Sequence, residues 1–163
     1  MTGIRLLRIA VSGHRGLPPE TGRLVDKAVR AALARLERPV TGLSCLADGA
    51  DQIFACAVLD HGGQLEAIIP AAEYRTGLPS EVHARYDHLL DRALSVHQLP
   101  FAESTSEAHM AASQFMLSSA DQLWAVWDGQ PARGHGGTAD VVAHARSEGV
   151  PVQVIWPAGA SRD

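Results

Sequence analysis

The sequence has few cysteines, few aromatic residues and no long apolar run. Its 163 residues include two cysteines, Cys45 and Cys56, which excludes a disulfide-stapled secreted scaffold. Neither cysteine belongs to a zinc-binding spacing, so we expect both to be buried free thiols. No apolar run approaches the roughly 20 residues that a membrane span needs, and the chain does not start with a signal peptide. We therefore expect a cytoplasmic protein with no membrane partner.

Basic charge is also scarce. Lys and Arg number 14 against 18 for Asp and Glu, which gives a formal net charge of −4. A mildly acidic chain is poorly suited to cover a polyanion over a wide face, so nucleic acid is not an expected partner. The eight histidines are not spaced as metal ligands, and we expect no metal site. The length fits a single domain over residues 1–163.

Short apolar runs alternate with segments of helical spacing along the chain. This alternation predicts parallel strands joined by right-handed crossovers, with helices on both faces of the sheet. We therefore expect a doubly wound, Rossmann-like three-layer α/β/α sandwich. Ser104 and Glu107 have the spacing of a capping box before one helix, and residues 157–163 are expected to be frayed. The expected strands lie at 6–12, 40–46, 64–69, 96–99, 122–127 and 150–156, and the expected helices at 18–36, 49–61, 80–93, 104–119 and 138–148.

The first strand ends in a segment suited to phosphate. It reads Ser12-Gly13-His14-Arg15. Glycine allows a sharp turn and lets a ligand approach bare backbone N–H groups. Arg15 offers a planar fork that matches two phosphate oxygens, and His14 can donate to a phosphate or stack on a base.

The second strand passes into a helix N-terminus through a further turn of this kind. Ser44, Asp48, Gly49 and Asp51 lie in it, and free N–H groups with the helix dipole favour an anion there. The alternative is a purely local role, with Asp48 as N-cap and Asp51 in the first turn.

A third segment is the richest in glycine. After a strand that ends near Trp127, Asp128 and Gly129 open a loop that continues through Arg133 to Gly136, Gly137 and Thr138. Four glycines between residues 129 and 137, just before a helix, suit a loop wrapped around a phosphate. The alternative is a surface loop without a ligand.

The expected topology brings these three strand ends to one edge of the sheet, where ligands of doubly wound folds bind. The arrangement predicts a ligand with a phosphate and a ring, that is, a nucleotide or a nucleotide-derived molecule. Tyr74 and Arg75 follow the third strand at the same edge and are further candidate contacts.

These segments resemble those of a known superfamily. Val11–Arg15, the stretch from Ser44 to Asp51, and the run from Asp121 through Gly129 to Gly136-Gly137-Thr138 are similar to the SLOG superfamily. That superfamily groups DprA-type DNA-processing proteins with the LOG phosphoribohydrolases, and the resemblance covers about residues 5–157. It implies a Rossmann-like fold that binds nucleotides, often as a homodimer.

Three functions follow as hypotheses. The first is a nucleotide-binding module that works as a sensor or carrier and requires no cofactor. The second is an N-glycosidase of nucleotides, for which Asp51, Asp128 and Asp140 are the candidate carboxylates. LOG enzymes place a catalytic glutamate three residues after the threonine of their glycine motif, and Val141 occupies that position here. The third is a carrier of a pterin or molybdenum cofactor, as some small relatives are.

Overall fold

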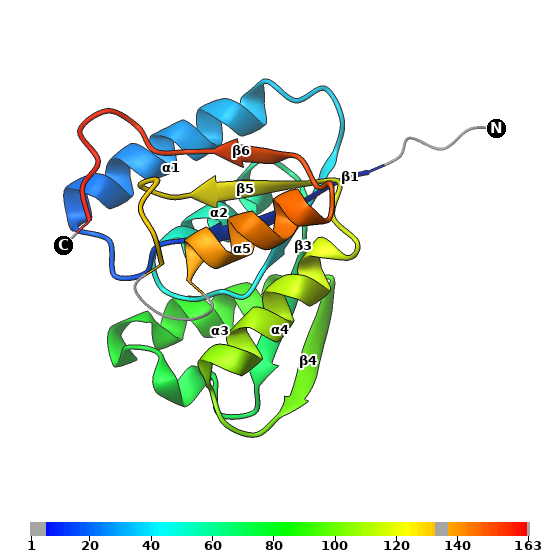
Figure 1. Ribbon diagram of the computed structural model, residues 1–163. Coiled ribbons are helices and arrows are strands. Elements are labelled where there is room, and N and C mark those ends of the chain that lie inside the picture. The colour runs from blue at the N-terminus through cyan, green and yellow to red at the C-terminus, as the bar shows by residue number, and fades with distance from the viewer. Residues whose placement is uncertain (1–5, 133–136, 163) are drawn as a thin grey trace.

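The computed structural model describes residues 6–132 and 137–162, and it contains one parallel sheet. Six strands lie in the order β4-β3-β2-β1-β5-β6 (Figure 1). Each neighbouring pair is parallel, with registers such as Ala10 opposite Leu43 and Leu123. The expected doubly wound, Rossmann-like architecture is confirmed. The strands are β1 Leu7–Gly13, β2 Val40–Ser44, β3 Gln64–Ala71, β4 Ser95–Phe101, β5 Gln122–Val126 and β6 Val152–Val154.

Helices cover both faces of this sheet. Alternate residues of β1 explain why: Ile9 packs with the helices of one face, and Ala10 belongs to the core of the other. On the first face, Phe54 meets Trp124 edge-on with ring centroids 5.8 Å apart. The helices are α1 Pro19–Ala34 and α2 Ala50–Asp60 on that face, α4 Ser106–Leu117 and α5 Thr138–Ser147 on the other, and α3 His83–Arg92 beside α2. Within the described residues, no helix is long and apolar enough to cross a membrane.

The strand order reverses direction between β1 and β5. The chain leaves β1 toward one face through α1 and leaves β5 toward the other through α5 (Figure 1). The two connections diverge at the carboxyl ends of these strands, and ligands of such sheets bind at this point.

Several boundaries differ from the expected ones. β4 is longer than expected and β6 is shorter. Two 3₁₀ turns, Arg75–Gly77 and Ser80–Val82, precede α3. The N-cap of α4 is Thr105, whose Oγ1 accepts from the Ala108 N–H at 3.2 Å, so the capping box at Ser104 is wrong. Ser104 instead places its hydroxyl 2.7 Å from His109 Nε2.

The C-terminal segment lies against α1. Thr21 Oγ1 donates to the Ser161 carbonyl and accepts from the Ser161 N–H, both at 2.9 Å. Thr21 is 1 % exposed, so its hydroxyl is shielded from water, whereas Ser161 is exposed. Residues 157–162 therefore differ from the frayed tail that composition predicts.

Candidate functional site

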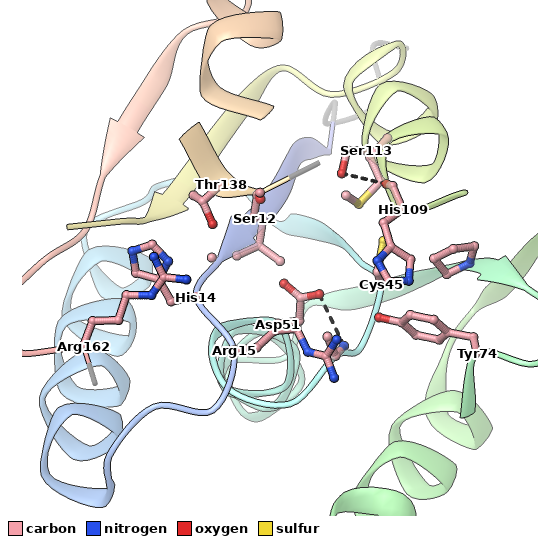
Figure 2. Close-up of a pocket in the computed structure, with 16 residues that line it drawn as sticks. Ser12, His14, Arg15, Cys45, Asp51, Tyr74, His109, Ser113, Thr138 and Arg162 are labelled. Carbon is pink, nitrogen blue, oxygen red and sulfur yellow. Dashed lines mark hydrogen bonds between the residues drawn. The ribbon is translucent and has the colours of Figure 1, made fainter. Parts of the chain in front are cut away.

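A cavity of about 210 Å³ opens at the carboxyl ends of the strands (Figure 2). Its walls come from the β1–α1 turn, the β2–α2 turn, the end of β3, α4, the start of α5 and the C-terminal tail. The candidate residues that line it are Ser12, Gly13, His14, Arg15, Asp51, Tyr74, Gly137 and Thr138. The remaining described candidates do not line it: Ser44, Asp48, Gly49, Asp128, Gly129 and Asp140. Arg133 and Gly136 lie outside the described residues.

The β1–α1 turn is fixed by close packing. A Cβ on Gly13 would lie 2.4 Å from the Ala50 Cβ, so no other residue fits there without displacing α2. His14 Nε2 lies 3.0 Å from the Asp128 N–H and 3.2 Å from Asp128 Oδ1. The buried ring of His14 thus joins the end of β1 to the residue that follows β5, and it holds these two strand ends together.

Arg15 is held by an acidic partner. Its Nε and Nη2 lie 2.9 Å and 2.8 Å from Asp48 Oδ1, and Asp48 Oδ2 accepts from the Gly16 N–H at 2.9 Å. Asp48 therefore orients the arginine and the following turn. It does not cap α2, whose N-cap is Gly49 without a side-chain hydrogen bond.

Gly49 supports the same turn from behind. Its φ is +85°, and a Cβ at this position would lie 2.6 Å from the His14 carbonyl oxygen. The next residue, Ala50, donates its N–H to that oxygen at 3.2 Å. Gly49 therefore lets α2 approach the backbone of His14 and Arg15, which explains its place outside the cavity.

The β2–α2 turn carries backbone strain. Leu46 is buried with a φ of +61°, an unfavourable conformation for a branched side chain. Three side chains hold it: Ser44 Oγ accepts from the Leu46 N–H at 3.1 Å, Gln52 Nε2 donates to the Leu46 carbonyl at 3.0 Å, and Asp51 Oδ2 accepts from the Ala47 N–H at 3.3 Å. The hydroxyl of Ser44 also donates to the Asp51 carbonyl at 3.1 Å. Ser44 thus shapes the turn that presents Cys45 and Ala47 to the cavity.

Asp51 carries the carboxylate of the cavity. In Figure 2 its side chain lies between the His14 and Thr138 side of the cavity and the Tyr74 and His109 side. Burial raises the pKa of this carboxyl from 3.8 to about 7, and nearby Asp48 adds to the rise, while the Ala47 N–H and Arg15 act against it. Asp51 can therefore be protonated and donate a hydrogen bond close to neutral pH.

The opposite wall is aromatic and apolar. The ring centroids of Tyr74 and His109 lie 5.6 Å apart in an edge-on arrangement, with Cys45 and Met116 beside them. Burial, with a smaller effect of Arg15, lowers the pKa of His109, so its imidazole is neutral at physiological pH. Burial also raises the pKa values of Cys45 and Tyr74, which are therefore uncharged. This wall suits a flat uncharged ring.

The α5 end of the cavity is polar. Helix α5 starts at Thr138 after the N-cap Gly137, and no side chain caps it. The first N–H groups of a helix have no partner within the helix, and here that end borders the cavity. Asp128 Oδ1 accepts from the Gln130 N–H at 3.0 Å, just outside. Burial opposes ionisation of Asp128, but the Gln130 N–H, His14 and Arg162 together lower its pKa.

The sequence interpretation missed several lining residues. Arg75, proposed with Tyr74, instead pairs with Asp87 through two hydrogen bonds of 2.8 Å and leaves the cavity. Among the described residues, no group of three or more His, Cys, Asp or Glu side chains is placed to hold a metal ion. The residues missed are Val11, Cys45, Ala47, Pro70, His109, Ser113, Met116 and Arg162. Three of them, His109, Ser113 and Met116, share one face of α4 at spacings of four and three residues.

Solved structures with the same architecture include DNA processing protein A (DprA) from Streptococcus pneumoniae. It superposes with a TM-score of 0.68 at 18 % sequence identity, over 94 % of this chain and 52 % of that one. DprA from Helicobacter pylori, described with a single-stranded DNA binding mode, gives 0.67 at 16 % identity over 95 % and 68 %. The molybdenum cofactor binding protein from Rippkaea orientalis gives 0.63 at 16 % identity over 95 % and 79 %.

The chain has the fold of these structures. This confirms, at the level of the fold, the resemblance seen in the sequence. The chain spans about half the length of the S. pneumoniae protein. No family model matches the sequence, and no curated protein matches it. These similarities establish the fold alone, and they do not identify a ligand.

Proposed function

We propose that this chain binds a nucleotide, or a nucleotide-derived ligand with one phosphate and one ring, in the cavity at the carboxyl ends of β1, β2 and β3. One observation carries the proposal. A single cavity is lined by two arginines, hydroxyl groups and a helix N-terminus, and also by the uncharged aromatic wall of Tyr74 and His109. A nucleotide likewise combines an anionic group with a flat ring.

The polar side matches a phosphate. Ser12, Gly13 and Arg15 come from the β1–α1 turn, and Gly137 and Thr138 from the start of α5. Hydroxyl groups, a helix N-terminus and a guanidinium are the groups that proteins use for phosphate oxygens. They converge here from two segments that are more than 120 residues apart in the sequence.

The size of the cavity favours a mononucleotide. Its volume of about 210 Å³ is below the roughly 300–1,000 Å³ of sites for drug-sized ligands. One nucleoside monophosphate would fill it, and a dinucleotide would extend into solvent. Among simple ligands, we therefore expect AMP, CMP or GMP to bind better per atom than NAD or ADP-ribose.

Calorimetric titration and thermal shift test the proposal with AMP, CMP, GMP, NAD, ADP-ribose, adenosine and inorganic phosphate. Arg15→Ala should weaken the best mononucleotide by about tenfold or more, because a hydrogen bond to a charged group is worth about 1.5–3 kcal/mol. His109→Ala should weaken the nucleotide but not inorganic phosphate, because it changes only the ring side. Arg146→Ala, an exposed position at the far end of α5, is the charge-matched control. If none of the nucleotides binds wild-type protein, the proposal fails.

A second candidate function is hydrolysis of an N-glycosidic bond. Asp51 is the described carboxylate that lines the cavity, whereas Asp128 and Asp140 do not. A carboxyl that is protonated near neutral pH can donate its proton to the departing base as the bond to C1′ of the sugar breaks. Water then adds to C1′, and the proton that it loses returns to the carboxylate of Asp51. The products from AMP would be adenine and ribose 5-phosphate.

Release of free base, followed by chromatography, separates binding from hydrolysis. Asp51→Asn should abolish release and keep AMP binding, because the amide retains the shape but has no acidic proton. Asp91→Asn, on the exposed side of α3, is the control. Binding of AMP without release of free base would support a nucleotide-binding module and refute the hydrolase.

Two other classes of ligand are tested by adding them to the same titration. A pterin cofactor also joins a flat ring to a phosphate, and the R. orientalis neighbour is a molybdenum cofactor binding protein. Single-stranded DNA is included as an oligonucleotide because of the H. pylori neighbour. Binding of DNA that AMP does not displace would contradict the mononucleotide assignment. The homodimer and the cytoplasmic location stay predictions, and gel filtration tests the first.

A further inference from the structure

The C-terminal tail brings a second arginine to the cavity. We propose that Arg162 contacts the anionic group of the ligand, and that the docking of residues 157–162 on α1 holds it in position. This inference rests on the proposed function, because it assigns one more contact to the same cavity.

The C-terminal tail is held at both of its ends. At its start, the ring of Trp156 meets the ring of His14 edge-on, with centroids 5.5 Å apart. At its end, Ser161 and Thr21 exchange two hydrogen bonds of 2.9 Å, in which Thr21 is both donor and acceptor. Since Arg162 follows Ser161 directly, its backbone is fixed by a contact to a buried residue of α1.

The side chain of Arg162 reaches the cavity. It lines the wall next to the His14 and Thr138 end, and Figure 2 shows it extending toward His14. Its charge contributes to the lowered pKa of Asp128, after the Gln130 N–H and His14, which places the guanidinium near the end of β5. Arg162 therefore lies at the polar side of the cavity, where the phosphate is proposed to bind.

The chemistry of the first arginine explains the need for a second. Nε and Nη2 of Arg15 both contact Asp48 Oδ1, so part of its fork is already used within the protein. A phosphate monoester carries up to two negative charges at neutral pH, more than one partly neutralised arginine can balance. Arg162 supplies further positive charge at the end of the cavity that His14 and Thr138 line, and it comes from the C-terminal tail.

The test compares AMP, adenosine and inorganic phosphate on four variants by calorimetric titration. Arg162→Ala should weaken AMP by about tenfold and leave adenosine within about twofold, because only AMP carries the anion. Arg162→Lys should bind AMP within about threefold of wild type. Thr21→Val removes the hydroxyl that holds Ser161 but leaves the arginine in place, so it should weaken AMP by a smaller factor. Arg146→Ala makes the same change in net charge at the far end of α5 and should stay within about twofold.

The outcomes separate this inference from the proposed function. Wild-type affinity for AMP in Arg162→Ala overturns the inference and leaves the function intact. An equal loss of AMP and adenosine also overturns it, because the arginine would then only shape the cavity. Binding of inorganic phosphate that depends on Arg162, with no nucleotide bound, supports the inference and refutes the function. If wild-type protein binds none of the three compounds, both fail.

Discussion

Replacement of Asp51 by asparagine should make the protein less sensitive to alkaline pH. The carboxyl has a pKa of about 7 in the folded protein because burial disfavours its charged form, whereas 3.8 is its ordinary value in an unfolded chain. An acid whose pKa is higher in the folded state loses folding free energy as pH rises. The loss starts near pH 3.8, continues to about pH 7 and then levels off.

The magnitude follows from the two pKa values. Each pKa unit corresponds to about 1.4 kcal/mol, so the full effect of Asp51 is roughly 4 kcal/mol. Between pH 5 and pH 8, where most globular proteins can be measured, about 2.5 kcal/mol of it is lost. Asparagine keeps an oxygen that can accept from the Ala47 N–H, and it cannot ionise.

Urea denaturation of wild type and Asp51→Asn at several pH values between 5 and 8 measures this effect. The difference in unfolding free energy between the two proteins cancels the titration of all other groups. We expect that difference to move in favour of the variant by about 2.5 kcal/mol from pH 5 to pH 8. A difference that does not change with pH would show that Asp51 is ionised in the folded protein at no cost, and the proposed acid role would lose its basis.

Three further outcomes follow from the local structure. Gly49→Ala should lower the unfolding free energy by about 3 kcal/mol or more in urea denaturation, because a Cβ would lie 2.6 Å from the His14 carbonyl oxygen at a φ of +85°. Gly62→Ala is the control, because Gly62 has a φ of +78° and open space around it, and it should cost only about 1 kcal/mol. Equal losses of unfolding free energy in the two variants would refute the clash expected at Gly49. Thr105→Ala should cost about 1 kcal/mol through loss of the α4 cap, measured in the same way, whereas Ser104→Ala should not reproduce that loss of capping. AMP at a hundred times its dissociation constant should add about 2.7 kcal/mol to the unfolding free energy of wild type and raise its melting temperature.

The fold was predictable because its signals are local. Strands buried on both faces, such as β2, read as short apolar runs, and helices such as α1 read as amphipathic segments between prolines. Cap positions were harder to predict, because Ser104 and Thr105 are adjacent hydroxyl residues and either can cap a helix. Only the direction in which the chain enters α4 decides between them.

The site was predictable in part, for a related physical reason. Glycine and arginine at the end of a strand are typical of a turn that binds an anion. Gly13 and Arg15 were therefore identified from the sequence as candidate ligand contacts. The contact between Thr21 and Ser161 spans 140 residues and has no local signal, so the tail and Arg162 were missed. Gly49 was identified as a ligand contact from its position in the turn, but its φ and its approach to the His14 backbone show a packing role.

The division of the cavity between different elements has a consequence for selectivity. One face of α4 contributes His109, Ser113 and Met116 to the side that would meet the ring, where they join Tyr74 and Cys45. The residues proposed to meet the anion come from other elements. Preference among purines, pyrimidines and larger heterocycles can therefore be retuned by exchanging three positions on one helix. Such exchanges would leave the contacts to the anionic group of the ligand unchanged.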